Sequence, residues 1–237
     1  MNVLISSGGT RERIDAVRSI TNASTGALGS LLADAFAAYG GVERIFYIAG
    51  PRALLPQTAK AEVIPIADAL DLEQAVRKTL AGNTVDAAAH CMAVSDFRVS
   101  KVTTVRRAAE AGGVEEAASL DRKTKIPSGL DDDKLILVLE ENPKIIPLFK
   151  HLSPHTLLVG FKLLDGVPHK TLIEAAYALL KQNRCTFVLA NDAQNIRGDA
   201  HTGYLVDAGK NIERWDTKAE IAVGIAAQVM NTLRAKS

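Results

Sequence analysis

The chain of 237 residues is 47% hydrophobic, which supports one sizeable core and favours a single domain. Its 28 Lys and Arg balance 27 Asp and Glu, so the net charge of +1 argues against nucleic acid or an anionic membrane as a partner. The two cysteines lack CxxC spacing, which excludes a cysteine-rich zinc module, and no apolar run reaches transmembrane length. We therefore expect a cytoplasmic protein with small-molecule ligands.

Short apolar runs rich in β-forming residues recur along the chain, with stretches of helical periodicity between them. The runs lie at residues 3–5, 45–48, 63–66, 85–91, 135–139, 157–161 and 186–190. Helices are expected over residues 68–80, 143–151, 170–182 and 218–233, each with an apolar stripe that can cover a sheet. This alternation predicts a doubly wound α/β fold: a mostly parallel, Rossmann-like sheet with helices on both faces.

The clearest helix lies between the first two expected strands. Its apolar face carries Leu28, Leu31, Leu32, Ala35, Phe36 and Tyr39. Ser24 or Thr25 is expected to cap the start of this helix, and Gly40 its end.

Two segments depart from the alternation. Residues 97–134 are polar and contain Gly112 and Gly113, which predicts a long active-site loop that acts as a mobile flap. Residues 199–215 predict a small β-hairpin at one sheet edge, with strands at 203–206 and 212–215. Neither segment requires a second domain, so one domain is expected to span residues 1–237.

Glycines and hydroxyl groups gather where ligands bind in α/β folds, beyond the carboxyl ends of strands. The first strand runs into Gly8, Gly9 and Thr10, and the first helix opens at Ser24, Thr25 and Gly26. Free amides and the helix dipole would favour a phosphate there, although a tight turn before a capped helix explains the same residues equally well. Neither G-x-x-x-x-G-K-[ST] nor G-x-G-x-x-G is present, which argues against an ordinary dehydrogenase.

The fourth expected strand ends at His90 and Cys91, and Asp96 follows at the same edge of the sheet. A carboxylate there can accept hydrogen bonds from two ribose hydroxyls. His90 and Cys91 point to opposite faces of the strand, so they cannot form a nucleophilic pair with each other.

A competing pattern lies near the carboxyl end of the chain. Tyr177 and Lys181 have the Y-x-x-x-K spacing of short-chain reductases, but such a pair also arises by chance. An NADP-dependent reductase and a non-catalytic nucleotide-binding protein are therefore kept as alternatives.

Taken in order, the motifs resemble those of phosphopantothenoylcysteine synthetase, also called phosphopantothenate–cysteine ligase. The matching segments are GGT at 8–10, DAVR at 15–18, NASTG at 22–26, GP at 50–51, AVSDF at 93–97, KI at 125–126, NPKI at 142–145, GFKL at 160–163 and AND at 190–192. They run in the family's order along nearly the whole chain. The resemblance implies a stand-alone form, with the pathway's decarboxylase on a separate protein.

The resemblance also implies the reaction. Members condense 4′-phosphopantothenate with L-cysteine in coenzyme A synthesis, after CTP, or ATP in its place, has activated the carboxylate as an acyl-nucleotide. Mg²⁺ is expected on the nucleotide phosphates, with no ligand from protein side chains. CTP is the expected nucleotide, and a homodimer is the implied assembly.

Roles for particular residues follow from the same resemblance. Lys125 is expected to reach the nucleotide phosphates, and Asn22 to hold the acyl-nucleotide carbonyl. Nucleotide contacts are expected from His90, Cys91, Met92, Ala93, Asp96, Pro143, Lys144, Ile145, Ile146, Phe161 and Lys162. Phosphate or substrate contacts are expected from Gly8, Gly9, Thr10, Arg18, Ser24, Thr25, Gly26 and Asp192. Outside these motifs, Lys125 would be an exposed loop lysine, Asn22 a helix cap and Asp192 a turn former.

Overall fold

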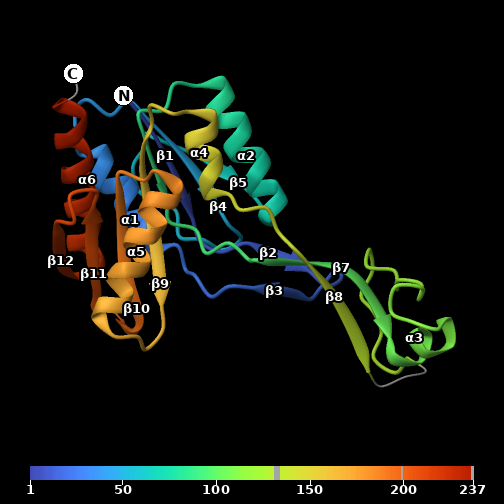
Figure 1. Ribbon diagram of the computed structural model, residues 1–237. Coiled ribbons are helices and arrows are strands. Elements are labelled where there is room, and N and C mark those ends of the chain that lie inside the picture. Colours follow the sequence, from blue (N-terminus) through green and yellow to red (C-terminus); the bar gives the residue numbers. More distant parts are fainter. Residues whose placement is uncertain (131–133, 199, 236–237) are drawn as a thin grey trace.

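The computed structural model describes residues 1–130, 134–198 and 200–235. Its main sheet contains β1 (Asn2–Ser7), β4 (Arg44–Ala49), β5 (Ala61–Pro65), β6 (Ala87–His90), β9 (Leu157–Leu164), β10 (Phe187–Arg197), β11 (Ala200–Asp207) and β12 (Ile212–Thr217). These eight strands lie in the order β12-β11-β10-β9-β6-β1-β4-β5 (Figure 1). β1, β4, β5, β6, β9 and β10 pair in parallel, whereas β11 and β12 add an antiparallel edge.

The order of the parallel strands defines the fold class. Numbered along the chain, they lie 3-2-1-4-5-6, from β5 through β1 and β6 to β10. This is the order of a doubly wound, Rossmann-like sheet, and it reverses between β1 and β6. The fold predicted from the sequence is confirmed, and the reversal point is where such a sheet binds its ligand.

Helices cover both faces of the sheet (Figure 1). They are α1 (Ala27–Ala37) and α6 (Lys218–Arg234) on one face, and α2 (Ala69–Gly82), α4 (Ile146–Leu152) and α5 (His169–Asn183) on the other. In β1, Val3 and Ile5 belong to the core under α1 and α6, whereas Leu4 belongs to the core under α2, α4 and α5. The two-residue period of a strand explains this division, because successive side chains point to opposite faces.

The expected capping of α1 is wrong at both ends. Its N-cap is Gly26, in a left-handed conformation with a φ of 73°, and no side chain caps the helix there. Ser24 and Thr25 therefore precede the cap, and the helix ends at a C-cap on Ala38, before Gly40. A glycine takes the left-handed conformation without steric cost, which explains why it replaces a hydroxyl residue at this position.

The expected core face of α1 is also partly wrong. Leu31 is 39% exposed, whereas Gly29 and Ala33 are buried. A Cβ atom on Gly29 would lie 2.1 Å from Ser7 Oγ, so this helix can approach the end of β1 only because it turns small residues toward it. Close approach of backbone, not the largest apolar stripe, sets the rotation of α1.

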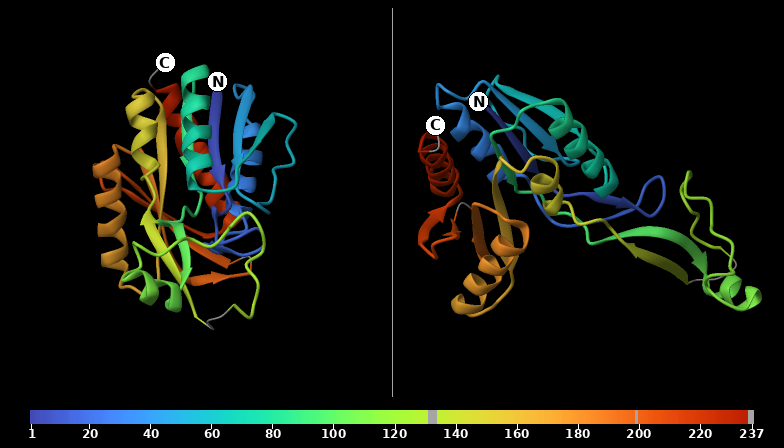
Figure 2. Two further views of the ribbon diagram at one scale, coloured as in Figure 1. Left: turned by 90° about the vertical axis from the view of Figure 1, so that its right-hand side faces the viewer. Right: turned by 45° about the horizontal axis from the view of Figure 1, so that its top comes forward.

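Residues 97–130 and 134–141 form an arm that projects away from the main sheet (Figures 1 and 2). The arm contains β7 (Phe97–Thr104), α3 (Val105–Ala111) and β8 (Leu135–Glu141), and β7 pairs with β8 in a separate antiparallel sheet. The run at 135–139 is therefore a strand, but its expected place in the parallel sheet is wrong. The expected loop at 97–134 also contains a strand and a helix.

A small separate core explains why the arm has regular structure. Val99, Val102 and Ile126 are buried together, with Leu137 and Ile20 packed against them. Ile20 belongs to a short hairpin of β2 (Arg11–Arg13) and β3 (Ser19–Thr21), which joins the arm to the body. Residues 131–133 of the expected flap lie outside the described residues.

The expected carboxyl-terminal hairpin is confirmed at the sheet edge. β11 and β12 pair antiparallel, with Gly203 opposite Trp215 and Val206 opposite Ile212. Residue 199, where the hairpin was expected to begin, lies outside the described residues. Within the described part of the chain, no helix combines the length and apolar character needed to cross a membrane.

Candidate functional site

The loops that follow β1 and β6 run side by side where the strand order reverses. The Ala93 amide donates to the Gly8 carbonyl (2.8 Å), and the Thr10 amide donates to the Ala93 carbonyl (3.2 Å). A Cβ atom on Gly9 would lie 2.6 Å from the Asn22 carbonyl oxygen, so glycine is needed for this approach. Gly8, Gly9 and Thr10 are buried in this contact and hold the two loops together.

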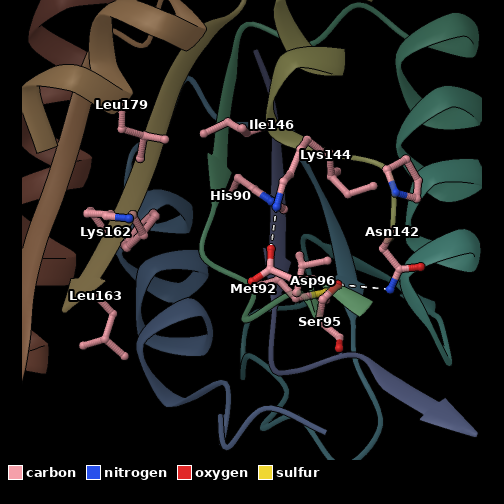
Figure 3. Close-up of a pocket in the computed structure, with 14 residues that line it drawn as sticks. His90, Met92, Ser95, Asp96, Asn142, Lys144, Ile146, Lys162, Leu163 and Leu179 are labelled. Carbon is pink, nitrogen blue, oxygen red and sulfur yellow. Dashed lines mark hydrogen bonds and ion pairs between the residues drawn. The ribbon is translucent and has the colours of Figure 1, made fainter. Parts of the chain in front are cut away.

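A cavity of about 290 Å³, here called the smaller cavity, opens beside these loops (Figure 3). It is lined by His90, Met92, Val94, Ser95, Asp96, Asn142, Pro143, Lys144, Ile145, Ile146, Phe161, Lys162, Leu163 and Leu179. The end of β6, the segment before α4 and the end of β9 therefore meet at one place, although they are far apart in sequence.

His90 is one of the buried polar residues that line the smaller cavity. Its Nδ1 atom lies 2.7 Å from Ser6 Oγ, and its ring is 5.4 Å from the ring of Phe149. Burial lowers the pKa of His90 to about 4, because the imidazolium would lose its hydration. The imidazole is therefore neutral at neutral pH.

Hydrogen-bonding groups surround the rest of this cavity. Lys144 Nζ and Asp96 Oδ1 form an ion pair at 2.5 Å between two exposed side chains (Figure 3). Asn142 is only 5% exposed, and its Nδ2 donates to the Ser95 carbonyl at 3.0 Å. Its Oδ1 is buried with no hydrogen-bond partner among the described residues. A ligand in the cavity would thus meet the Asp96 carboxylate and the Lys144 ammonium group among its lining residues.

A cavity of about 1000 Å³, here called the larger cavity, adjoins the smaller one. It is lined by Thr21, Asn22, Ala23, Ser24, Thr25, Gly26, Ala27, Leu28, Gly29, Cys91, Met92, Ala93, Phe161, Leu163, Asn191, Ile196, Gly198, His201 and Lys218. Met92, Phe161 and Leu163 line both cavities, so one extended ligand can occupy the two.

The amino-terminal end of α1 forms one wall of the larger cavity. No side chain caps this end, and its first turn carries no acidic residue. Asn22 stands next to it, with its Nδ2 donating to the Val94 carbonyl at 3.0 Å. The Ala27 amide donates to Thr25 Oγ1 at 3.4 Å, and the positive end of the helix dipole makes this wall suitable for an anion.

His201 and Lys218 line the larger cavity from β11 and α6, and neither was expected from the sequence. His201 is 5% exposed, and both of its ring nitrogens lack a hydrogen-bond partner among the described residues. Burial, and then the charge of Lys218, lower its pKa to about 4. His201 alternates with the buried Gly203 and Leu205 along β11, which is the strand period that could have placed it on the inner face.

The cavities collect most of the expected site residues. The expected nucleotide residues His90, Cys91, Met92, Ala93, Asp96, Pro143, Lys144, Ile145, Ile146, Phe161 and Lys162 all line one cavity or both. Asn22, Ser24, Thr25 and Gly26 line the larger cavity. Gly8, Gly9, Thr10, Arg18, Lys125 and Asp192 line neither.

Asp192 organises a loop instead. Its carboxylate accepts hydrogen bonds from the amides of Gly166 (3.0 Å), Val167 (3.1 Å) and Gln194 (2.9 Å). These bonds, led by that from Gly166, lower the pKa of Asp192. The residue therefore holds the loop between β9 and α5, as a turn former does.

Arg18 and Lys125 lie where the arm meets the hairpin of β2 and β3. The buried carboxylate of Asp15 accepts hydrogen bonds from the Arg18 guanidinium and from the Ile126 amide (3.0 Å). Arg18 also donates to the Ile126 carbonyl at 2.7 Å. These bonds fix the backbone of Ile126, next to Lys125. The Lys125 side chain itself is exposed and lines neither cavity. Its role at the nucleotide phosphates stays a prediction.

The Y-x-x-x-K pair belongs to neither cavity. Both residues lie on α5, where Lys181 Nζ stands 4.8 Å from the centre of the Tyr177 ring. The geometry thus lends no support to a reductase that uses this pair.

The strand order and the two cavities at its reversal point define a doubly wound α/β protein with its candidate ligand site at the carboxyl edge of the sheet. The family of the DNA/pantothenate metabolism flavoprotein C-terminal domain matches residues 1–126 and 108–233. The chain belongs to that family, and the resemblance to phosphopantothenoylcysteine synthetase is confirmed.

Similar proteins cover most of the chain. The coenzyme A biosynthesis bifunctional protein CoaBC of Thermococcus kodakarensis is 32% identical over 222 residues, which are 93% of this chain and 48% of that protein. The chain thus spans about half the length of the curated relatives it matches.

Solved structures agree with the fold. The crystal structure of the DNA/pantothenate metabolism flavoprotein from Streptococcus pneumoniae is 32% identical, with a TM-score of 0.86 and coverage of 98% of this chain and 99% of that one. The C-terminal domain of a CoaBC protein is 22% identical, with a TM-score of 0.72 and coverage of 99% and 96%, and it supports the fold alone.

Proposed function

We propose that this protein is a ligase that joins the carboxylate of 4′-phosphopantothenate to the amine of L-cysteine in coenzyme A synthesis. The observation that carries the proposal is the convergence of the expected nucleotide residues, from three stretches of chain, on two adjoining cavities. Membership of the family, and relatives named for coenzyme A biosynthesis, support it.

In this proposal the base and ribose of the nucleotide occupy the smaller cavity. The Asp96 carboxylate accepts hydrogen bonds from the ribose hydroxyls. Because Lys144 is paired with this carboxylate, it must share Asp96 with the ribose or release it. We propose CTP as the nucleotide, with ATP as the alternative.

The phosphates then extend past Met92 and Phe161 into the larger cavity, toward the amino-terminal end of α1. Among the described residues, no group of three or more His, Cys, Asp and Glu side chains could hold a metal ion. These side chains offer no cage of three or more ligands, and we propose that Mg²⁺ enters on the phosphate oxygens of the nucleotide.

The reaction has two halves. A carboxylate oxygen of 4′-phosphopantothenate attacks the α-phosphorus, the bond to pyrophosphate breaks, and an acyl-nucleotide forms. The cysteine amine then attacks the acyl carbonyl and loses a proton, and the nucleoside monophosphate leaves with the bonding electron pair. We propose that Asn22 orients the acyl-nucleotide and that Lys125 stabilises phosphate charge in the first half.

We also propose the cellular compartment and the oligomeric state of the protein. The free thiols of Cys91 and Cys185 fit a reducing compartment such as the cytoplasm. Burial raises the pKa of both thiols to about 12, so neither is a reactive thiolate at neutral pH. A homodimer is proposed from the resemblance, and the molar mass in solution tests it.

The measurement is pyrophosphate release with CTP, then with ATP, in the presence of 4′-phosphopantothenate and cysteine. We expect release with CTP, loss of release in Lys125→Ala, and accumulation of the acyl-nucleotide in Asn22→Ala. Lys123→Ala, an exposed neighbour on the same loop, is the control and should keep parental activity. No pyrophosphate with either nucleotide would overturn the ligase; NADPH binding would then favour a reductase, and CTP binding without turnover a non-catalytic protein.

A further inference from the structure

The larger cavity has a second polar wall, to which the proposed function gives no role. His201 stands near the start of β11 and Lys218 at the start of α6, and both line the cavity. They lie in a part of the chain remote in sequence from α1, whose open end forms the other polar wall.

His201 is a buried polar residue whose ring nitrogens have no hydrogen-bond partner among the described residues. A neutral imidazole carries one N–H donor and one acceptor nitrogen, and neither is paired within the described part of the chain. Buried polar groups without partners are rare because each one costs the loss of its hydration. A ring that is 5% exposed and lines a cavity is therefore placed to receive a hydrogen bond from the cavity's occupant or to donate one to it.

The charge of this wall selects the kind of occupant. Lys218 is half-buried, and its Nζ donates to the Gly198 carbonyl at 2.7 Å, which holds the ammonium group beside the cavity. No aspartate or glutamate is among the described residues that line the larger cavity. A cation, an N–H donor and a helix amino terminus around one space favour a group with several anionic oxygens.

We propose that His201 and Lys218 form a phosphate contact site of the larger cavity, in addition to the one at the start of α1. The phosphate belongs either to the β,γ end of the nucleotide or to 4′-phosphopantothenate, and both present the same oxygens. The identity of these ligands rests on the proposed function, whereas the contact with a phosphate does not.

The experiment measures binding by isothermal titration calorimetry with four probes: inorganic pyrophosphate, CTP, CMP and 4′-phosphopantothenate. The variants are His201→Phe and Lys218→Met, with His201→Asn as a second, smaller replacement. His155→Phe and Lys170→Met are matched controls, because both parent side chains are exposed and lie outside the cavities. Circular dichroism establishes that each variant is folded.

We expect each cavity variant to weaken binding by about tenfold or more, the effect of losing one charge-assisted contact. Weaker CTP and pyrophosphate with unchanged CMP assigns the site to the nucleotide, whereas weaker 4′-phosphopantothenate alone assigns it to the second substrate. If His201→Phe does not fold, His201→Asn and Lys218→Met decide the question.

Two further outcomes separate this proposal from the ligase. Parental affinity of the folded variants for all four probes would overturn the contact site, as would a parent protein that binds none of them. A parent that binds pyrophosphate through His201 and Lys218, yet releases none from CTP in the ligase assay, would keep the site and remove the proposed function.

Discussion

At the scale of single residues, His90 shows how burial sets the chemistry of the smaller cavity. The ring is held by contacts with Ser6 and Phe149, and its low pKa keeps it uncharged. With a neutral imidazole at His90, the charged side chains that line this cavity are Asp96, Lys144 and Lys162. A nucleotide would therefore meet one carboxylate and two ammonium groups there.

The same low pKa predicts a pH dependence of stability. The pKa of His90 is about 4 in the folded protein against an ordinary 6.5, so between these values the unfolded chain binds a proton that the folded one does not. Unfolding free energy should fall as pH decreases from 6.5 to 4. His90→Gln should remove about 3 kcal/mol of that decrease, as measured by urea unfolding at each pH.

Two carboxyl groups with shifted pKa values, Asp15 and Glu12, can be distinguished from His90. Hydrogen bonds from Arg18 hold the pKa of Asp15 below its ordinary 3.8, so its contribution is lost only at lower pH. Burial raises the pKa of Glu12 from 4.5, which acts in the opposite sense to His90. The difference between parent and His90→Gln isolates the histidine, and equal pH profiles for the two proteins would contradict the prediction.

At the scale of elements, the contact between α1 and β1 depends on a missing side chain. Gly29 lies against Ser7, and this approach sets where the open end of α1 stands beside the larger cavity. An added methyl group would have to displace the helix or the end of the strand, because a Cβ would lie 2.1 Å from Ser7 Oγ and 2.5 Å from its Cβ.

Gly29→Ala should therefore lower the free energy of unfolding by about 1–3 kcal/mol, the usual cost of overpacking a close contact. Gly82→Ala is the matched control at the end of α2, where a Cβ meets nothing within 4 Å. That control should raise stability by about 0.5 kcal/mol through the unfolded state. Thermal unfolding of both variants tests the prediction, and similar melting temperatures would show that α1 has room to move.

At the scale of the whole molecule, two core layers share one sheet. Leu32 of α1 packs in one layer and Leu72 of α2 in the other, and both are fully buried. Because adjacent residues of the same strands line the two layers, loss of either should unfold the sheet as a unit.

Leu32→Ala and Leu72→Ala should each lower the free energy of unfolding by about 2–5 kcal/mol. Leu31→Ala and Leu70→Ala, on the exposed sides of the same helices, should change it by about 0.5 kcal/mol or less. Urea unfolding followed by circular dichroism measures all four variants. A two-step unfolding curve for Leu32→Ala or for Leu72→Ala would mean that the two core layers unfold independently.

Much of the fold and most of the lining of the candidate site could be predicted from the sequence. Local periodicity was sufficient for α1, α2, α4, α5 and α6 and for the strands of the parallel sheet, but not for α3 in the arm. The resemblance of the ordered motifs to the family implied that residues 90–96, 143–146 and 161–162 share one site, and these residues do line the two adjoining cavities.

Only the tertiary structure decided the remainder. The run at 135–139 satisfies the pattern of a sheet strand, yet it pairs with β7 in the arm, because pairing depends on a partner that periodicity cannot name. Leu31 was displaced from the core by the close approach of Gly29, and His201 reached the larger cavity through a hairpin at the far edge of the sheet. Sequence by itself determined which surfaces of each element are apolar, whereas the path of the backbone and its closest contacts determined which of those surfaces meet.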